Sequence, residues 1–146
     1  RQDVPVLEGT TDHAAVANGA YVLADSDGVP EVVLIGTGSE VSVALDAAAT
    51  LTAAGRAVRV VSMPCMELFA EQADDYRCSV LPDGVPTLSV EAGVTFGWAR
   101  WADRSVGIDR FGASAPGERA MAELGITPDA VVTAAESLLD RPGGPR

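Results

Sequence analysis

The sequence contains no lysine, one histidine, two cysteines and only 5% aromatic residues. All ten basic residues are arginines, and 21 residues are acidic, which gives a net charge of −11. Nucleic acids and anionic membranes are bound by clustered cations, so this balance excludes them as the main partners. Acid–base, metal and nucleophilic sites commonly use imidazole. The single histidine, His13, therefore argues against a self-contained active site and indicates one domain of a larger protein.

Long apolar runs and paired metal ligands are also missing. The longest apolar runs span a few residues, such as 32–35, whereas a membrane helix needs about 20. No basic segment followed by an apolar stretch opens the chain, so we expect no export signal and a cytoplasmic location. Cys65 and Cys78 lack CxxC spacing and a nearby histidine, which argues against zinc. Reduced, packed thiols are the favoured interpretation, although the spacing leaves a disulfide open.

The length and patterning predict one folded domain. With 146 residues, of which 47% are hydrophobic, the chain can bury a core of its own. Residues 1–18 are polar and are interpreted as an entering linker, in which His13 is exposed and inert. The domain itself is expected over residues 19–140, and residues 141–146 are expected to form a disordered tail.

Strands and helices alternate along the domain. Apolar runs predict strands at residues 21–24, 31–35, 57–63, 86–91 and 105–109. Helical spacing predicts a helix between Thr37 and Gly55, and further helices at 66–76, 93–102, 117–124 and 128–139. This alternation predicts an α/β fold with three layers (α/β/α) and a five-stranded, mostly parallel sheet. A short turn separates the first two strands, so we expect them to pair as an antiparallel hairpin.

Local signals mark two helix starts and one interface. Thr37 and Glu40 have the spacing of a capping box, and Thr127 is placed to cap the last helix. Trp98 and Trp101 lie three residues apart on one predicted helix. We interpret them as anchors that pack against another domain, in preference to a stacking platform for a ligand.

A candidate anion site follows the second strand at Gly36, Thr37, Gly38 and Ser39. A turn that ends a strand and opens a helix offers backbone amides to an anion. Val41 replaces the third glycine of the dinucleotide fingerprint, however, and no Walker Lys-Ser pair follows. A tight, capped turn is therefore the favoured interpretation. A regulatory module that binds a small anion or nucleotide at residues 36–40 is the alternative.

Two acidic residues follow later strands. Glu91 ends the fourth strand and Asp109 ends the fifth, at the edge where open α/β sheets bind ligands. They have no second ligand type beside them in sequence. We therefore expect each to cap a loop or to pair with an arginine such as Arg110, and expect no metal or catalytic role.

Several long motifs in register are similar to the C-terminal domain of transketolase, of bacterial type. They cover nearly the whole chain and are Gly-Thr-Gly-Ser-Glu-Val (36–41), Val-Val-Ser-Met-Pro (60–64), Tyr-Arg-Cys-Ser-Val-Leu-Pro (76–82), Val-Glu-Ala-Gly (90–93) and Gly-Ile-Asp-Arg-Phe-Gly-Ala-Ser-Ala-Pro (107–116). The resemblance implies an enzyme of the pentose phosphate pathway that moves a two-carbon ketol unit from a ketose phosphate to an aldose phosphate.

The resemblance also implies a division of labour. Transketolases use thiamine diphosphate with Mg²⁺ or Ca²⁺, work as homodimers, and hold the cofactor and metal in two preceding domains. This chain is then expected to carry no cofactor, metal or catalytic residue, and to be inactive alone. Its expected partners are the pyrimidine-binding domain of the same enzyme and, in the full-length protein, a second subunit.

One site residue carries over from the resemblance. In the family, an arginine in a Ser-Arg-Gln string contacts the phosphate of the sugar substrate, and Arg1 and Gln2 match the last two members. A guanidinium presents a planar fork of donors that suits phosphate oxygens. The serine has no counterpart here, so Arg1 is a candidate phosphate-binding residue that rests on two of the three residues of the string.

Overall fold

Five strands form one mixed sheet in the computed structural model, which describes residues 6–7 and 13–140. The strands are β1 (Tyr21–Ala24), β2 (Val32–Gly36), β3 (Val58–Ser62), β4 (Thr87–Val90) and β5 (Arg104–Val106). Their order is β1-β3-β2-β4-β5; β2 to β5 run parallel and β1 pairs antiparallel with β3. The predicted five-stranded, mostly parallel sheet is confirmed.

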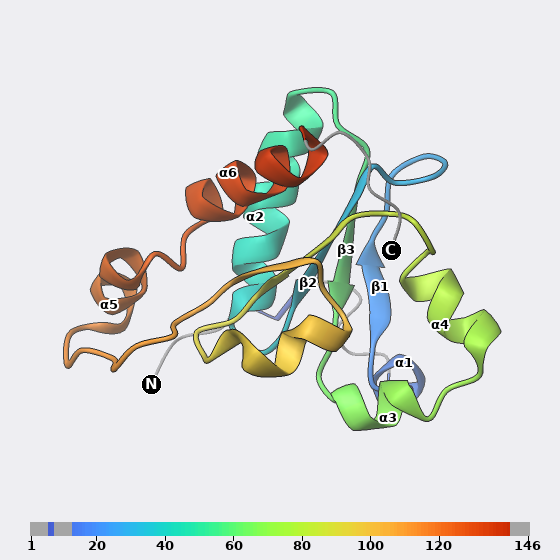
Figure 1. Ribbon diagram of the computed structural model, residues 1–146, viewed down its shortest axis with the longest axis horizontal. Helices are drawn as coiled ribbons and strands as arrows, with labels where there is room; N and C mark the ends of the chain where they lie inside the picture. Colours follow the sequence, from blue (N-terminus) through green and yellow to red (C-terminus); the bar gives the residue numbers. More distant parts are fainter. Residues whose placement is uncertain (1–5, 8–12, 141–146) are drawn as a thin grey trace.

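Helices cover both faces of the sheet, which confirms the three layers (Figure 1). On one face lie α2 (Glu40–Ala53) and α6 (Pro128–Leu139); on the other lie α3 (Met66–Ala70), α4 (Asp74–Val80) and the 3₁₀ helix η1 (Thr95–Arg100). Two further helices, α1 (His13–Ala17) and α5 (Gly117–Leu124), complete the described chain.

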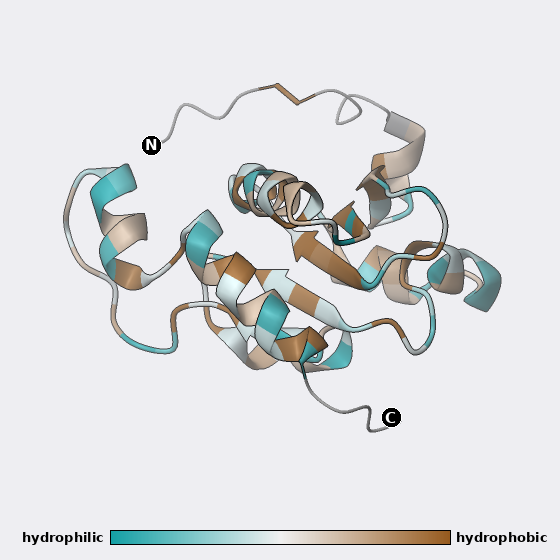
Figure 2. Cartoon of the chain, turned by 90° about the horizontal axis from the view of Figure 1, so that it is seen from above, coloured by the Kyte–Doolittle hydropathy of each residue, from teal (hydrophilic) through white to brown (hydrophobic). Residues whose placement is uncertain are grey.

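The central strand β2 divides the core into two clusters. Every residue of β2 is buried, and alternate side chains point to opposite faces of a strand. Val32 and Leu34 pack with α2 and α6, whereas Val33 and Ile35 pack with Phe69 and the second cluster. Brown segments in Figure 2 lie along the strands between the helices, as this arrangement requires.

The predicted hairpin between the first two strands is wrong. β1 lies next to β3, with Tyr21 opposite Ser62 and Val22 opposite Val61. β2 has no free edge for β1 because β3 and β4 already pair with it on its two sides. The crossover through α2 brings β3 beside β2, and β1 then takes the outer edge of β3. Its antiparallel direction was predicted correctly, but its neighbour was not.

Two helix predictions near the N-terminal half also need correction. No capping box forms at α2: Ser39 is the N-cap, and its side chain does not cap a backbone N–H of the helix. Its Oγ instead donates to Glu40 Oε1 at 2.6 Å. The single helix expected over residues 66–76 is two helices, α3 and α4. Arg77 contributes to the break, because its Nη1 donates to the carbonyl of Ala70 at 2.8 Å.

The C-terminal helices match their predictions. α5 and α6 have the predicted bounds, and the Thr127 hydroxyl accepts a hydrogen bond from the Ala130 N–H at 3.2 Å. Pro128 occupies the first turn of α6, where a missing N–H costs nothing. The predicted helix over residues 93–102 is the shorter 3₁₀ helix η1.

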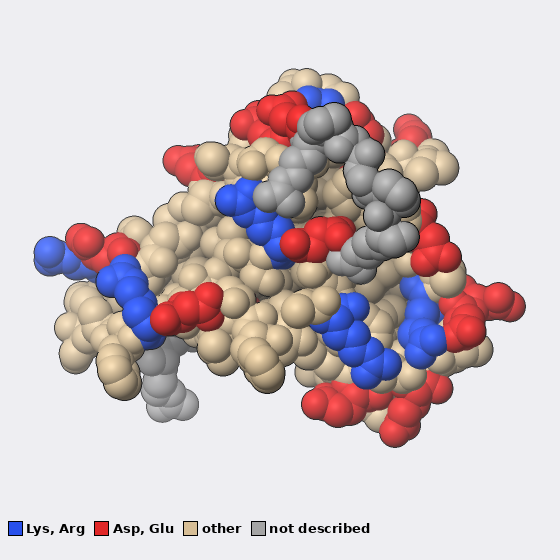
Figure 3. Space-filling view, viewed as in Figure 1, with Lys and Arg blue, Asp and Glu red and all other residues tan. Residues whose placement is uncertain are grey.

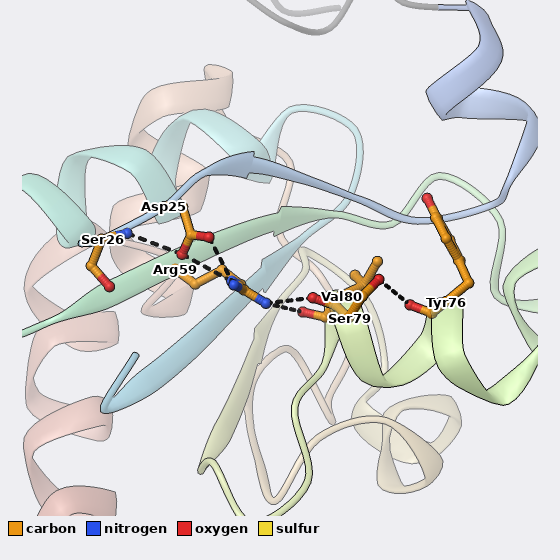
Figure 4. A network of polar contacts seen from close by, with 6 residues as sticks. All are labelled: Asp25, Ser26, Arg59, Tyr76, Ser79 and Val80. Carbon is orange, nitrogen blue, oxygen red and sulfur yellow. Dashed lines mark hydrogen bonds and ion pairs between the residues drawn. The ribbon is translucent and has the colours of Figure 1, made fainter. Parts of the chain in front are cut away.

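A largely buried arginine ties three elements together (Figure 4). Arg59 of β3 donates to both carboxylate oxygens of Asp25, at 2.9 and 2.7 Å. Its Nη1 also donates to the carbonyls of Ser79 and Val80 at the end of α4, at 2.6 and 3.2 Å. The Arg59 side chain is 11% exposed and that of Asp25 is 40% exposed. This Arg59 network therefore joins the chain after β1 to α4 across the sheet.

Candidate functional site

Open α/β sheets bind ligands at the carboxyl edge of their parallel strands, so a site is expected at that edge. Here β2 runs into a turn that opens α2. The turn is tight: a Cβ on Gly36 would lie 2.9 Å from the Cα of Val41, and Gly38 has φ +56°. Gly36 and Gly38 are thus required by the backbone itself, as the interpretation as a tight turn expects.

The same turn holds a buried carboxylate. Glu40 is only 6% exposed, and the one hydrogen bond described for its carboxylate comes from the Ser39 hydroxyl. Negative charge placed at a helix N-terminus already uses the positive end of the helix dipole. It also repels a second anion at the same place. Anion binding by Gly36, Thr37, Gly38 and Ser39 stays a prediction, with Glu40 working against it.

Both acids at the ends of the later strands hold loops. Glu91 accepts a hydrogen bond from the indole N–H of Trp98 at 2.6 Å. Asp109 accepts from the N–H and the hydroxyl of Thr95, each at 2.8 Å, and these bonds hold the pKa of Asp109 below its ordinary value. The loop-capping role is confirmed. Pairing with Arg110 is not, because that guanidinium donates to the carbonyl of Glu123.

A shallow, open cleft lies beside β5, with a volume of about 260 Å³. The polar groups on its wall already have partners: Arg104 donates to Ser137 Oγ, and Ser105 shares a hydrogen bond with Ser89. It is lined by Thr95, Ala99, Ala102, Asp103, Arg104, Ser105 and Asp109. The one hydroxyl–carboxylate pair that these bonds show in the lining, Thr95 and Asp109, is the pair that holds the loops together, so we assign the cleft no catalytic step.

The two tryptophans belong to the domain's own core, which corrects their interpretation as anchors for another domain. Trp98 is 2% exposed and packs in the second cluster. The ring of Trp101 lies 5.0 Å from that of Phe69 and is covered by the Arg100 guanidinium at 4.7 Å. The prediction that the two tryptophans pack against apolar residues is confirmed, but they pack against β2 and α3 of the same domain.

Both cysteines are free thiols, Cys65 half-buried and Cys78 exposed. Desolvation and the neighbouring Asp83 and Asp74 raise the pKa of Cys78, which lowers its nucleophilicity near neutral pH. Among the described residues, no three histidine, cysteine, aspartate or glutamate side chains gather to hold a metal ion. Nor does the described part of the chain contain a helix long and apolar enough to cross a membrane.

Two predicted residues cannot be placed, and two exposed residues were overlooked. Arg1 lies outside the described residues, and so does the side chain of His13, although α1 begins there. The predicted tail at residues 141–146 is likewise outside them. Phe96, in η1 after β4, is 89% exposed, and Phe111, on the loop after β5, is 100% exposed. Each directly precedes a glycine, a signal that was available in the sequence.

Comparison with known proteins decides the family. The family described as "Transketolase-like TK C-terminal domain" matches residues 19–127. The chain belongs to the transketolase C-terminal domain family. The domain is 51% identical to "Transketolase 7" of Craterostigma plantagineum and 47% identical to the transketolase of Rhodobacter capsulatus, over 94% and 95% of the chain. It covers 21% and 22% of those two proteins.

Solved structures agree with the sequence relatives. The transketolase of Leishmania mexicana matches 99% of this domain with a TM-score of 0.93 at 44% identity, and 21% of that chain is covered. A Pichia stipitis transketolase in complex with sedoheptulose 7-phosphate matches 94% with a TM-score of 0.88 at 38% identity, and 20% of that chain is covered. The relatives come from plants, bacteria, yeast and a protozoan, so the narrower bacterial assignment has no support.

The transketolase C-terminal domain does not itself fit thiamine diphosphate and its metal. A metal-bound diphosphate requires clustered oxygen ligands and a free anion cradle. The described residues contain no such metal cluster, and Glu40 occupies the one helix start that follows a glycine-rich turn. No step of the chemistry can be assigned to the described residues.

Proposed function

We propose that this chain serves as the C-terminal domain of a transketolase, an enzyme that transfers a two-carbon ketol unit between ketose and aldose phosphates with thiamine diphosphate and Mg²⁺ or Ca²⁺. The observation that carries the proposal is the coverage. Relatives called transketolases match almost the whole chain, yet the chain spans about one fifth of their length. The rest of the enzyme would then hold the cofactor.

Within that enzyme the role of the domain is structural. Its polar groups at the strand ends are used to hold loops, as the bonds from Trp98 to Glu91 and from Thr95 to Asp109 illustrate. We expect it to support the preceding pyrimidine-binding domain and the homodimer, in the cytoplasm. Arg1 is the one residue for which we propose contact with substrate, through the phosphate of the sugar.

The test is the activity of two proteins, the 146-residue chain and the full-length polypeptide that carries it. With thiamine diphosphate, Mg²⁺, xylulose 5-phosphate and ribose 5-phosphate, the full-length protein is expected to form sedoheptulose 7-phosphate and the chain alone to form none. No turnover by the full-length protein would refute the assignment. Turnover by the chain alone would refute the structural role.

The alternative, an anion-binding module, gives a different signature. A ligand that binds the folded state raises the unfolding midpoint by mass action. Millimolar phosphate, ATP or ribose 5-phosphate is expected to leave the midpoint of the isolated chain unchanged. A rise that is lost in Gly38→Ala but kept in Gly84→Ala would favour the anion site. Both glycines have a positive φ and open space around them, so the pair is matched.

A further inference from the structure

The two exposed phenylalanines stand out from the other aromatic residues. Of the aromatic side chains in the described chain, only Phe96 and Phe111 are exposed, at 89% and 100%, and Val94 beside Phe96 is 62% exposed. A fully exposed aromatic ring in water forgoes the stabilisation that burial gives. Figure 3 shows a broad uncharged area over the loops after β4 and β5, with charged residues around it.

These two loops form one fixed frame. The Thr95 N–H and hydroxyl bind Asp109, and the Ile108 N–H donates to the carbonyl of Gly93 at 2.7 Å. The loops approach so closely that a Cβ on Gly107 would lie 2.7 Å from the methyl group of Thr95. Phe96 adjoins one end of this cross-link and Phe111 the other. A surface held in place before binding loses little conformational entropy when a partner arrives.

The chain beyond Phe111 has little support from the rest of the domain, apart from the half-buried Met121, which packs against the first core cluster. Residues 110–119 are exposed throughout, and α5 contains no buried residue. Figures 1 and 2 both show α5 at one end of the long axis, apart from the α2–α6 pair. A helix this short has little stability of its own in water and normally depends on packing. We call residues 110–124 the arm.

The charge of this region differs from that of the remaining chain. Residues 94–119 contain four arginines and three acidic residues, whereas the rest of the sequence has six arginines and eighteen acidic residues. The net charge is therefore +1 in this region and −12 in the remainder. Aromatic side chains and arginine are enriched in protein interfaces, and residues 94–119 supply both.

The direction of β1 brings the upstream chain to the same edge. Because β1 is antiparallel to its neighbour, it begins where β3 ends: Tyr21 pairs with Ser62, and the Gly19 carbonyl accepts from the Cys65 N–H at 3.0 Å. β2, β4 and β5 end at that edge too. Figure 1 shows α1 at this end of the sheet. Any polypeptide joined before residue 13 therefore reaches the domain on the edge that carries Phe96 and Phe111.

We propose that Val94, Phe96, Phe111 and the arm form the docking surface for the part of the transketolase chain that precedes this domain. The proposal rests on the proposed function, since it is the relatives' remaining four fifths that supply the occupant. Covalent attachment at the same edge gives that occupant a high effective concentration, which a second copy of the chain lacks. The partner surface is apolar and neutral to weakly acidic, with recesses for two phenyl rings.

Hydrogen exchange of the arm tests the proposal in two proteins, the isolated chain and the full-length transketolase polypeptide. The arm is expected to exchange at least about tenfold more slowly in the full-length protein than in the isolated chain. Phe111→Ser is expected to remove this difference, and Phe111→Leu to keep most of it. Val29→Ser is the matched control: Val29 is 79% exposed and lies before β2, at the opposite edge of the sheet.

Three results would overturn the docking surface. The arm could exchange equally fast in both proteins, Val29→Ser could match Phe111→Ser, or the isolated chain could sediment as a dimer that Phe111→Ser dissociates, which would make a second copy the occupant. Ketol transfer by the unsubstituted full-length protein is measured separately. An unprotected arm with normal turnover refutes only the docking surface, whereas absent turnover refutes the proposed function.

Discussion

The Arg59 network allows a quantitative test of what holds β1 and α4 to the sheet. Asp25→Asn removes the charge that faces Arg59, and Arg59→Met keeps the apolar stem but removes four hydrogen bonds. Breaking a buried ion pair costs about 3–5 kcal/mol, whereas a surface pair is worth about 0–1 kcal/mol. Arg59 is 11% exposed but Asp25 is 40% exposed, which places this pair between the two limits.

We therefore expect Asp25→Asn to lower the free energy of unfolding by about 2 kcal/mol. Arg59→Met should cost more, because it also leaves the carbonyls of Ser79 and Val80 without their donor. Urea unfolding of the two single variants and the double variant gives the coupling energy, which we expect to be about 1–2 kcal/mol.

The control is the exposed pair of Arg56 and Glu31, with side chains 39% and 42% exposed and atoms 3.2 Å apart. Its coupling energy, measured from Arg56→Met, Glu31→Gln and the double variant, should stay below about 0.5 kcal/mol. If the Asp25–Arg59 coupling were no larger than this, the network would add nothing beyond a surface pair. The argument from burial would then be refuted.

Three further predictions follow from single residues. Gly19→Ala should prevent stable folding, because Gly19 has φ +82° and a Cβ there would lie 2.3 Å from a backbone nitrogen. Gly28 has φ +88° but open space around it, so Gly28→Ala should lower the free energy of unfolding in urea by only about 1–2 kcal/mol. The pKa of Asp109 in the folded state lies below its ordinary value of 3.8, so its contribution to the free energy of unfolding is fully present above pH 3.8 and is lost as pH falls through the lower folded pKa. Asp109→Asn should therefore reduce the loss of stability that acid causes, as measured by urea unfolding at a series of pH values. An equal loss of stability in the variant and the unsubstituted chain would contradict this role of Asp109. Cys78 has a raised pKa despite its exposure, so iodoacetamide at pH 8 should alkylate it more slowly than free cysteine, as timed by mass spectrometry; a faster reaction would contradict the electrostatics.

Local signals in the sequence were enough for the elements whose ends depend on neighbouring residues. Thr127 and Pro128 mark the start of α6, and the left-handed Gly125 ends α5, so both helices were placed correctly. The run around Val33 likewise marked a strand buried on both faces. Each of these depends on contacts within a few residues or on burial alone.

The failures arose where a distant segment decides the outcome. The neighbour of β1 depends on β3, which lies more than 30 residues later, and no turn residue encodes that choice. The break in the expected long helix is bridged by a bond from Arg77 to the Ala70 carbonyl, which spacing alone does not show. The exposure of Phe111 is also a tertiary property, because the same residue type is buried at position 69.

The pairing of β1 with β3 has a consequence for the order of folding. A hairpin with β2 would close a loop of a few residues, but the observed pairing encloses all of β2, α2 and their connections. Closing the larger loop costs more chain entropy before any contact repays it. We therefore expect the β2–α2–β3 unit to form before the first strand joins its edge. The strand that comes first in the sequence is then expected to be among the last to find its partner.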